Sequence, residues 1–99
     1  MVNWYCLKDC MDDGDVLAAA KVIILDVDPH DGAQETDIMA KLRAVGFKGI
    51  VILDDINLNE KMKAFWSEIP ERKLDITSYG HWSGTGIVYF SDEIRVDFV

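Results

Sequence analysis

Two short apolar runs, each ending in aspartates, constrain the fold of this chain more than any other feature. The runs are Lys21–Asp28 (KVIILDVD) and Gly49–Ile56 (GIVILDDI). Both are rich in β-branched residues and lack polar alternation, which is typical of strands buried on both faces of a parallel sheet. We therefore predict two parallel strands, over about residues 21–28 and 49–56.

The segment between these runs has the pattern of an amphipathic helix. Thr36, or Asp31 slightly earlier, is a suitable N-cap. Apolar residues follow at helical spacing, at Ile38, Met39, Leu42 and Val45. Gly46 lies where a helix commonly ends in a left-handed glycine. Strand, helix and strand together predict a βαβ unit, whose crossover is expected to be right-handed.

A second helix is predicted directly after the second run. Asn57, with Glu60 three residues later, resembles a capping box. A bulky stripe at helical spacing follows, and it consists of Met62, Phe65, Trp66 and Ile69. A stripe of this kind indicates packing against the sheet, and Pro70 ends the helix.

The rest of the chain has the alternation of strands. Residues 74–78, 84–90 and 94–98 predict two or three antiparallel strands at one edge of the sheet. At the other end of the chain, Val2–Leu7 predicts a strand and Val16–Lys21 a short helical or extended lead-in.

Composition restricts the class of protein and its partners. With 99 residues, 49% of them apolar, residues 1–99 are expected to form one small globular domain. No apolar run is long enough to cross a membrane, and the N-terminus lacks a signal-peptide pattern, so we expect a cytoplasmic protein.

The formal charge of -8, without a basic cluster, argues against nucleic acid as a partner. Cys6 and Cys10 have no histidine near them in sequence and are expected to be reduced thiols.

Acidic residues follow both predicted strands, where each strand ends. Asp26 and Asp28 follow the first strand, and Asp54 and Asp55 end the second. Because the carboxyl ends of parallel neighbours meet at one edge of a sheet, these carboxylates are expected to converge near His30. Oxygen-rich clusters suit Mg²⁺, Ca²⁺ or Mn²⁺. The alternative is that each aspartate is only a strand-to-loop or capping residue.

The glycine-rich segment 80–86 (GHWSGTG) has two interpretations. Glycine-rich loops bind phosphate when they open a helix, but this one leads into a strand-like run. A hairpin turn is therefore favoured, and His81 and Trp82 could line a pocket if the turn folds over the acidic edge.

Residues 20–90 resemble the second half of class I S-adenosylmethionine-dependent methyltransferases, through the runs VIILDVDPH and GIVILDD. The closest likeness is to metal-dependent small-molecule O-methyltransferases. The resemblance implies a Rossmann-like half domain, an α/β fold of two or three layers with a parallel βαβ core and antiparallel C-terminal strands. It also implies a divalent metal, Mg²⁺ or Ca²⁺, held by Asp26, Asp54 and Asp55, a small-molecule acceptor, and His30 as the nearest match to a catalytic base.

The chain departs from this family at the cofactor. The family binds S-adenosylmethionine mainly through a glycine-rich loop in its first half, and no G-x-G-x-x-G pattern occurs before residue 21. We therefore expect no cofactor-binding residues here, and S-adenosylmethionine only if a partner supplies the missing half. The chain would be a fragment, a truncated product or a reduced domain, and whether it is an enzyme stays open. The alternatives are a non-enzymatic self-associating α/β domain and a small metal- or ligand-binding module.

The missing half also leaves one strand without a neighbour. In the family, the strand that matches residues 22–28 lies in the middle of the sheet. An exposed sheet edge recruits partners. We expect this edge to be covered by Val2–Leu7 or by a second copy of the chain across a twofold axis, which makes a homo-oligomer.

Overall fold

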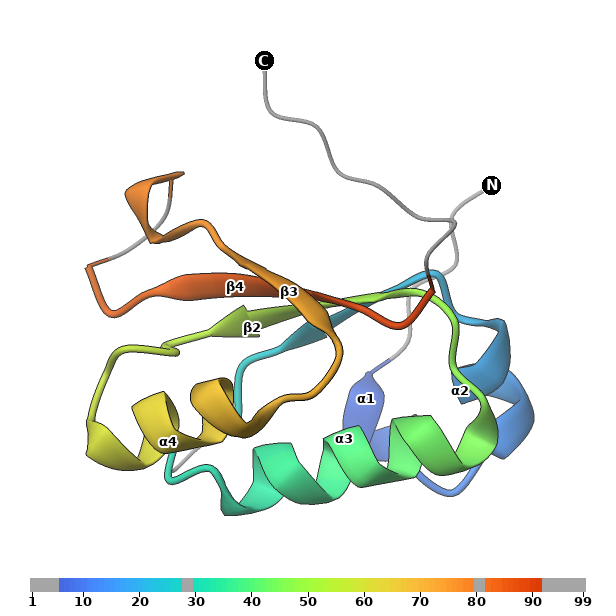
Figure 1. Ribbon diagram of the computed structural model, residues 1–99. Helices are drawn as coiled ribbons and strands as arrows, with labels where there is room; N and C mark the ends of the chain where they lie inside the picture. The colour runs from blue at the N-terminus through green and yellow to red at the C-terminus, as the bar shows by residue number, and fades with distance from the viewer. Residues whose placement is uncertain (1–5, 28–29, 80–81, 92–99) are drawn as a thin grey trace.

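The computed structural model describes residues 6–27, 30–79 and 82–91 (Figure 1). In chain order its elements are α1 (Leu7–Cys10), α2 (Gly14–Ala19), β1 (Val22–Leu25), α3 (Ala33–Val45), β2 (Ile50–Asp54), α4 (Glu60–Glu68), β3 (Arg72–Asp75), the 3₁₀ turn η1 (Thr77–Tyr79) and β4 (Thr85–Tyr89). The four strands form one sheet in the order β1-β2-β4-β3. β1 pairs with β2 in parallel, and β4 is antiparallel to both β2 and β3.

This topology confirms the parallel βαβ core and antiparallel pairing after it. The strand predicted over residues 74–78 is only partly right, because β3 ends at Asp75 and Thr77–Tyr79 forms a 3₁₀ turn. The mixed four-stranded sheet makes the chain a small α/β domain. The third antiparallel strand predicted over residues 94–98 lies outside the described residues.

The sheet and its helices form two layers. Figure 1 shows α3 and α4 along the same face of the sheet. The strands contribute alternate side chains to the core beneath the helices, namely Ile23, Leu25, Val51, Leu53 and Val88. The opposite face carries a smaller apolar cluster made of Ile50, Ile87 and Tyr89, with Ile76 against it. The sequence was compatible with two or three layers, and the described residues form two.

The prediction that both parallel strands are buried on both faces is wrong for β1. Val22 and Ile24 are 53% and 58% exposed, whereas Ile23 and Leu25 are buried. β1 is the outer strand of the described sheet, and only one of its faces packs against the helices. β2 has a strand on each side and buries residues on both faces, so it fits the prediction better.

The predicted helices are present, but their N-caps differ from those expected. The residue before α3 is Gly32, with φ 84°, and neither Thr36 nor Asp31 is the cap. Asp31 instead accepts a hydrogen bond from the backbone N–H of Ala33 (2.9 Å), and Thr36 donates its hydroxyl to the Gly32 carbonyl (2.6 Å). Gly46 ends the helix in the left-handed conformation, φ 76°, as predicted.

The start of α4 is set by Asn59 rather than by Asn57. The Asn59 side chain accepts a hydrogen bond from the backbone N–H of Met62 at 2.9 Å, which satisfies one of the free donors of the first turn. The predicted stripe is confirmed, because Met62, Phe65 and Ile69 are buried and Trp66 packs against the same core.

The N-terminal segment is helical where it is described. Residues 2–5 of the strand predicted over Val2–Leu7 lie outside the described residues, and Leu7 begins α1, so no strand reaches it. The lead-in to β1 is the helix α2. Cys6 and Cys10 are free thiols, as expected. None of the described helices is long and apolar enough to cross a membrane.

Candidate metal site

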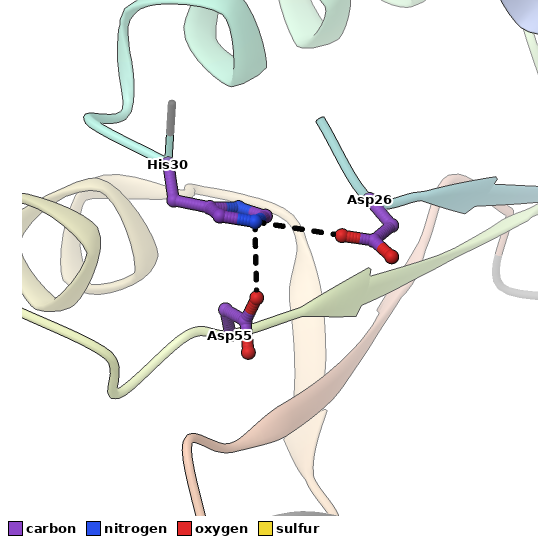
Figure 2. Close-up of side chains that lie close together, drawn as sticks. All are labelled: Asp26, His30 and Asp55. Carbon is purple, nitrogen blue, oxygen red and sulfur yellow. Dashed lines mark ion pairs between the residues drawn. The ribbon is translucent and has the colours of Figure 1, made fainter. Parts of the chain in front are cut away.

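The carboxyl ends of β1 and β2 meet at one edge of the sheet. The parallel register pairs Leu25 with Leu53, so the residues that follow the two strands emerge side by side. Asp26 follows β1, Asp55 follows β2, and the chain returns to the same place at His30, just before α3 (Figure 2). Two segments, the loop between β1 and α3 and the residue after β2, therefore contribute side chains to one place.

The imidazole of His30 lies between the two carboxylates. Its Nε2 is 3.1 Å from Oδ2 of Asp55 and 3.5 Å from Oδ1 of Asp26 (Figure 2). One ligand atom from each of the three residues can be chosen so that all lie within 4.8 Å of one another. The side chains of His30 and Asp55 are only 13% and 17% exposed, whereas that of Asp26 faces solvent. The group is therefore enclosed on one side and open on the other.

Two hydrogen bonds hold Asp55 in place. Its backbone N–H donates to the carbonyl of Gly84 (2.8 Å), and its Oδ1 accepts from the hydroxyl of Ser83 (2.5 Å). Ser83 is itself buried, and its carbonyl accepts from the backbone N–H of Asn57 at 2.7 Å. With Oδ1 engaged by Ser83, the other oxygen, Oδ2, is the one that faces His30.

His30 is held from the opposite side of the group. Its carbonyl accepts a hydrogen bond from the side-chain amide of Asn59 at 3.0 Å. Because Asn59 also caps α4, this bond ties the loop before α3 to the start of α4. The backbone at His30 is thus tied to the start of α4.

A fourth carboxylate, Glu35, lies behind the histidine. It is in the first turn of α3, is 2% exposed, and its Oε2 is 3.9 Å from Nδ1 of His30. Among the described residues, neither of its carboxylate oxygens receives a hydrogen bond. Glu35 was not predicted as a site residue. The signal was available, because Glu35 occupies the first position of an i, i+3, i+4, i+7 stripe that continues with Ile38, Met39 and Leu42.

Of the residues predicted to form the site, the structure brings together Asp26, Asp55 and His30. Asp54 is the last residue of β2, opposite Thr85 in the register, and is not a member of this group. Side chains alternate along a strand, so Asp54 points to the face opposite the fully buried Leu53. Asp28 lies outside the described residues.

The glycine-rich segment is also partly placed. Gly80 and His81 lie outside the described residues, and Trp82 is exposed. Gly84, with φ 96°, leads directly into β4 and not into a helix, which agrees with the predicted turn and not with a phosphate-binding loop. The segment reaches the site through Ser83.

The donor set suits a divalent cation. One imidazole nitrogen and two carboxylate oxygens are common ligands of divalent cations. Carboxylates this close to one another repel unless a cation or a proton relieves them.

Comparison of the chain with protein-family models, with curated proteins and with solved structures finds no match. Function must therefore be inferred from the geometry of this group.

Proposed function

We propose that this chain is a divalent-cation-binding α/β domain, with the cation held by Asp26, His30 and Asp55. The observation that carries the proposal is the convergence of three ligand atoms within 4.8 Å, two from the loop between β1 and α3 and one from the residue after β2. A buried carboxylate without a hydrogen bond from the described residues, Glu35, faces the same imidazole. Three carboxylates thus surround one histidine, which can carry at most one positive charge.

We propose further that this edge is the metal and substrate side of a methyltransferase-like, Rossmann-like half domain. The parallel pair β1-β2, the antiparallel β4 beside it, and the acids at the strand ends support this proposal. The cation would bind and orient the hydroxyl of a small-molecule acceptor. Because His30 would itself hold the cation through Nε2, it has no lone pair left to act as the base that the resemblance implies, and the proton of the hydroxyl would pass to water.

We propose that this domain does not bind S-adenosylmethionine by itself. Its seven glycines include no G-x-G-x-x-G pattern. Methyl transfer would therefore require a partner that supplies the cofactor-binding half, and the isolated domain is proposed to be inactive.

Thermal unfolding with added metal tests the cation site. A ligand that binds only the folded state, at about 100 times its Kd, adds about 2.7 kcal/mol of stability. For a domain of this size that corresponds to a rise in Tm of roughly 10–20 °C. Asp55→Asn should abolish the rise, since asparagine tolerates the positive φ of 61° at this position but carries no charge. Asp37→Asn, on the exposed face of α3, is the matched control.

Two outcomes would contradict these proposals. An absence of any rise with Mg²⁺, Ca²⁺, Mn²⁺ or Zn²⁺ at millimolar concentration, or an equal rise in Asp55→Asn, excludes the cation site. If calorimetry shows that the isolated chain binds S-adenosylmethionine, the proposal that it lacks the cofactor-binding half is wrong.

A second candidate function is self-association through the edge of β1. Two apolar side chains, Val22 and Ile24, are exposed on this outer strand of the described sheet. A twofold axis at Ile23 would pair two copies of β1 antiparallel, with Val22 opposite Ile24 of the second copy. The two sheets would then become one and the exposed side chains would pack across the axis.

A further inference from the structure

We infer that Glu35 is a positioning residue for His30. We infer also that the site so built prefers ions that bind imidazole well, such as zinc and cobalt, over Mg²⁺ or Ca²⁺. The inference rests on the proposed cation site and narrows it to a class of metal. It starts from the buried carboxylate of Glu35, which the fold by itself does not explain.

Glu35 occupies a position that the core would fill with an apolar side chain. Its neighbours on the same face of α3 are Ile38 and Met39, both buried. A buried carboxylate destabilises a fold unless something compensates its charge. Among the described residues no donor satisfies its oxygens, and the nearest charged partner is Nδ1 of His30, 3.9 Å from Oε2.

The two nitrogens of His30 face different groups. Nδ1 faces Glu35, and Nε2 faces Asp26 and Asp55. A carboxylate at Nδ1 favours the tautomer that carries its proton there, which leaves the lone pair of Nε2 directed at the two aspartates. Histidines that bind metals nearly always give their other N–H to a carboxylate, a backbone carbonyl or water. A shift of about 1 Å would bring Nδ1 and Oε2 to hydrogen-bond distance.

A nitrogen ligand changes which cations the site prefers. Carboxylate oxygens alone suit Mg²⁺, Ca²⁺ and Mn²⁺, whereas imidazole suits zinc, iron, nickel and copper. The all-carboxylate set expected from the sequence (Asp26, Asp54 and Asp55) would favour the first group of ions. The set that the structure brings together, with His30 in place of Asp54, favours the second.

Calorimetric titration of the full chain with Zn²⁺, Co²⁺ and Mg²⁺ tests the preference. The titrations use a Cys6→Ser background, because the exposed Cys6 thiol would otherwise compete for zinc. We expect Zn²⁺ and Co²⁺ to bind at least about 100-fold more tightly than Mg²⁺. In His30→Asn, an oxygen replaces the nitrogen at a residue type that tolerates the φ of 58°, and the preference should disappear.

Glu35→Gln tests the positioning role. We expect Zn²⁺ affinity to fall about tenfold while Mg²⁺ affinity changes little, since loss of such a supporting carboxylate weakens the nitrogen ligand. The ¹⁵N shifts of the His30 ring supply a readout that a packing role would not move. The proton should reside on Nδ1 in the parent chain, and both tautomers should be populated in Glu35→Gln. A thermal melt of the metal-free variant, expected to be no lower than that of the parent, shows that it folds.

The outcomes distinguish failure of this inference from failure of the proposed cation site. If ions bind in an Asp55-dependent manner but Mg²⁺ equals Zn²⁺, or if Glu35→Gln leaves both affinity and ring shifts unchanged, the inference is overturned and the cation site stands. If no ion binds the parent chain, both are overturned.

Discussion

The imidazole of His30 and the carboxylate of Asp55 are 3.1 Å apart, and both residues have positive φ, 58° and 61°. They are the two non-glycine residues with this conformation in the part of the chain that the structure describes. A left-handed backbone costs an ordinary residue about 1–2 kcal/mol. The hydrogen bonds from Asn59 to His30 and from Ser83 to Asp55 hold these conformations. Backbone strain in this domain is therefore concentrated where the proposed ligands face one another.

Ser83→Ala should weaken the cation site and the fold together. The Ser83 hydroxyl donates to a partly buried carboxylate at 2.5 Å, and loss of a hydrogen bond to a charged group costs about 1.5–3 kcal/mol. Urea denaturation measures the stability, and metal titration should show a weaker Kd because Asp55 is no longer oriented. Ser67→Ala, which removes an exposed hydroxyl on α4, is the control. Parent-like metal affinity in Ser83→Ala would contradict the role of Ser83.

Glu35→Leu should stabilise the metal-free protein while it weakens metal binding. Removal of a buried, unsatisfied carboxylate relieves a penalty of about 1–3 kcal/mol, and leucine continues the apolar stripe of α3. Urea denaturation in the presence of a chelator measures the gain. Glu68→Leu, at an exposed position of α4, should change stability little. A Glu35→Leu variant less stable than the parent would show that the carboxylate supports the fold itself.

Gly84→Ala should destabilise the fold far more than Gly46→Ala. Both glycines have positive φ, 96° and 76°, so each substitution carries the same conformational cost of about 1–2 kcal/mol. A Cβ at Gly84 would also lie 2.7 Å from Nδ2 and 2.9 Å from the backbone N of Asn57, whereas a Cβ at Gly46 meets nothing within 4 Å. The difference in Tm between the two variants measures the steric clash with Asn57, since the cost of positive φ is common to both. Equal losses would contradict the close packing of this turn against Asn57.

Ile24→Lys should dissociate the proposed oligomer without unfolding the domain. Light scattering at high protein concentration is expected to give a dimer for the parent chain and a monomer for the variant, because a charged side chain on an edge strand opposes pairing. The matched control is Leu74→Lys, on the strand at the other edge of the described sheet. A parent chain that stays strictly monomeric would exclude self-association through β1.

The ion pair between Arg43 and Glu71 should make stability depend on pH. Two hydrogen bonds of 2.7 and 2.8 Å join the guanidinium to the carboxylate and tie the end of α3 to the segment before β3. These hydrogen bonds from Arg43 hold the pKa of Glu71 below its usual value, so the unfolded chain binds the proton more tightly. The stabilisation is complete above the pKa of an unfolded glutamate and is lost as pH falls through the folded value.

Glu71→Gln measures this contribution. Since the pair is partly exposed, we expect a loss of about 0.5–1 kcal/mol near pH 7, which shrinks as pH falls through the lowered pKa of Glu71, by urea denaturation at each pH. Glu60→Gln, whose exposed partner Lys63 is 3.4 Å away, should show a smaller change. A Glu71→Gln loss that persists at low pH would mean that packing, not charge, is responsible.

Local patterns were sufficient for the two parallel strands and the two longer helices, but not for α1 or the 3₁₀ turn at Thr77–Tyr79. The β-branched runs at 22–25 and 50–54 became the parallel strands, and Gly46 ended α3 as expected. The helix N-caps were harder to assign, because Asn57 and Asn59 are equally suitable residues two positions apart. Only the geometry of the first turn distinguishes them.

The sequence by itself determined the two parallel strands, the helices α3 and α4, and the aspartates that follow both strands. It did so because the spacing of apolar residues is a local property of the sequence. The tertiary structure decided that Asp55 and not Asp54 faces His30, since it set which face of β2 meets the loop before α3. It also decided that Glu35 is buried behind the histidine and that one face of β1 stays open. The stripe on α3 indicates that Glu35 is buried, but its closeness to His30 and the open face of β1 depend on which neighbours each face meets in space, and no local pattern carries that information.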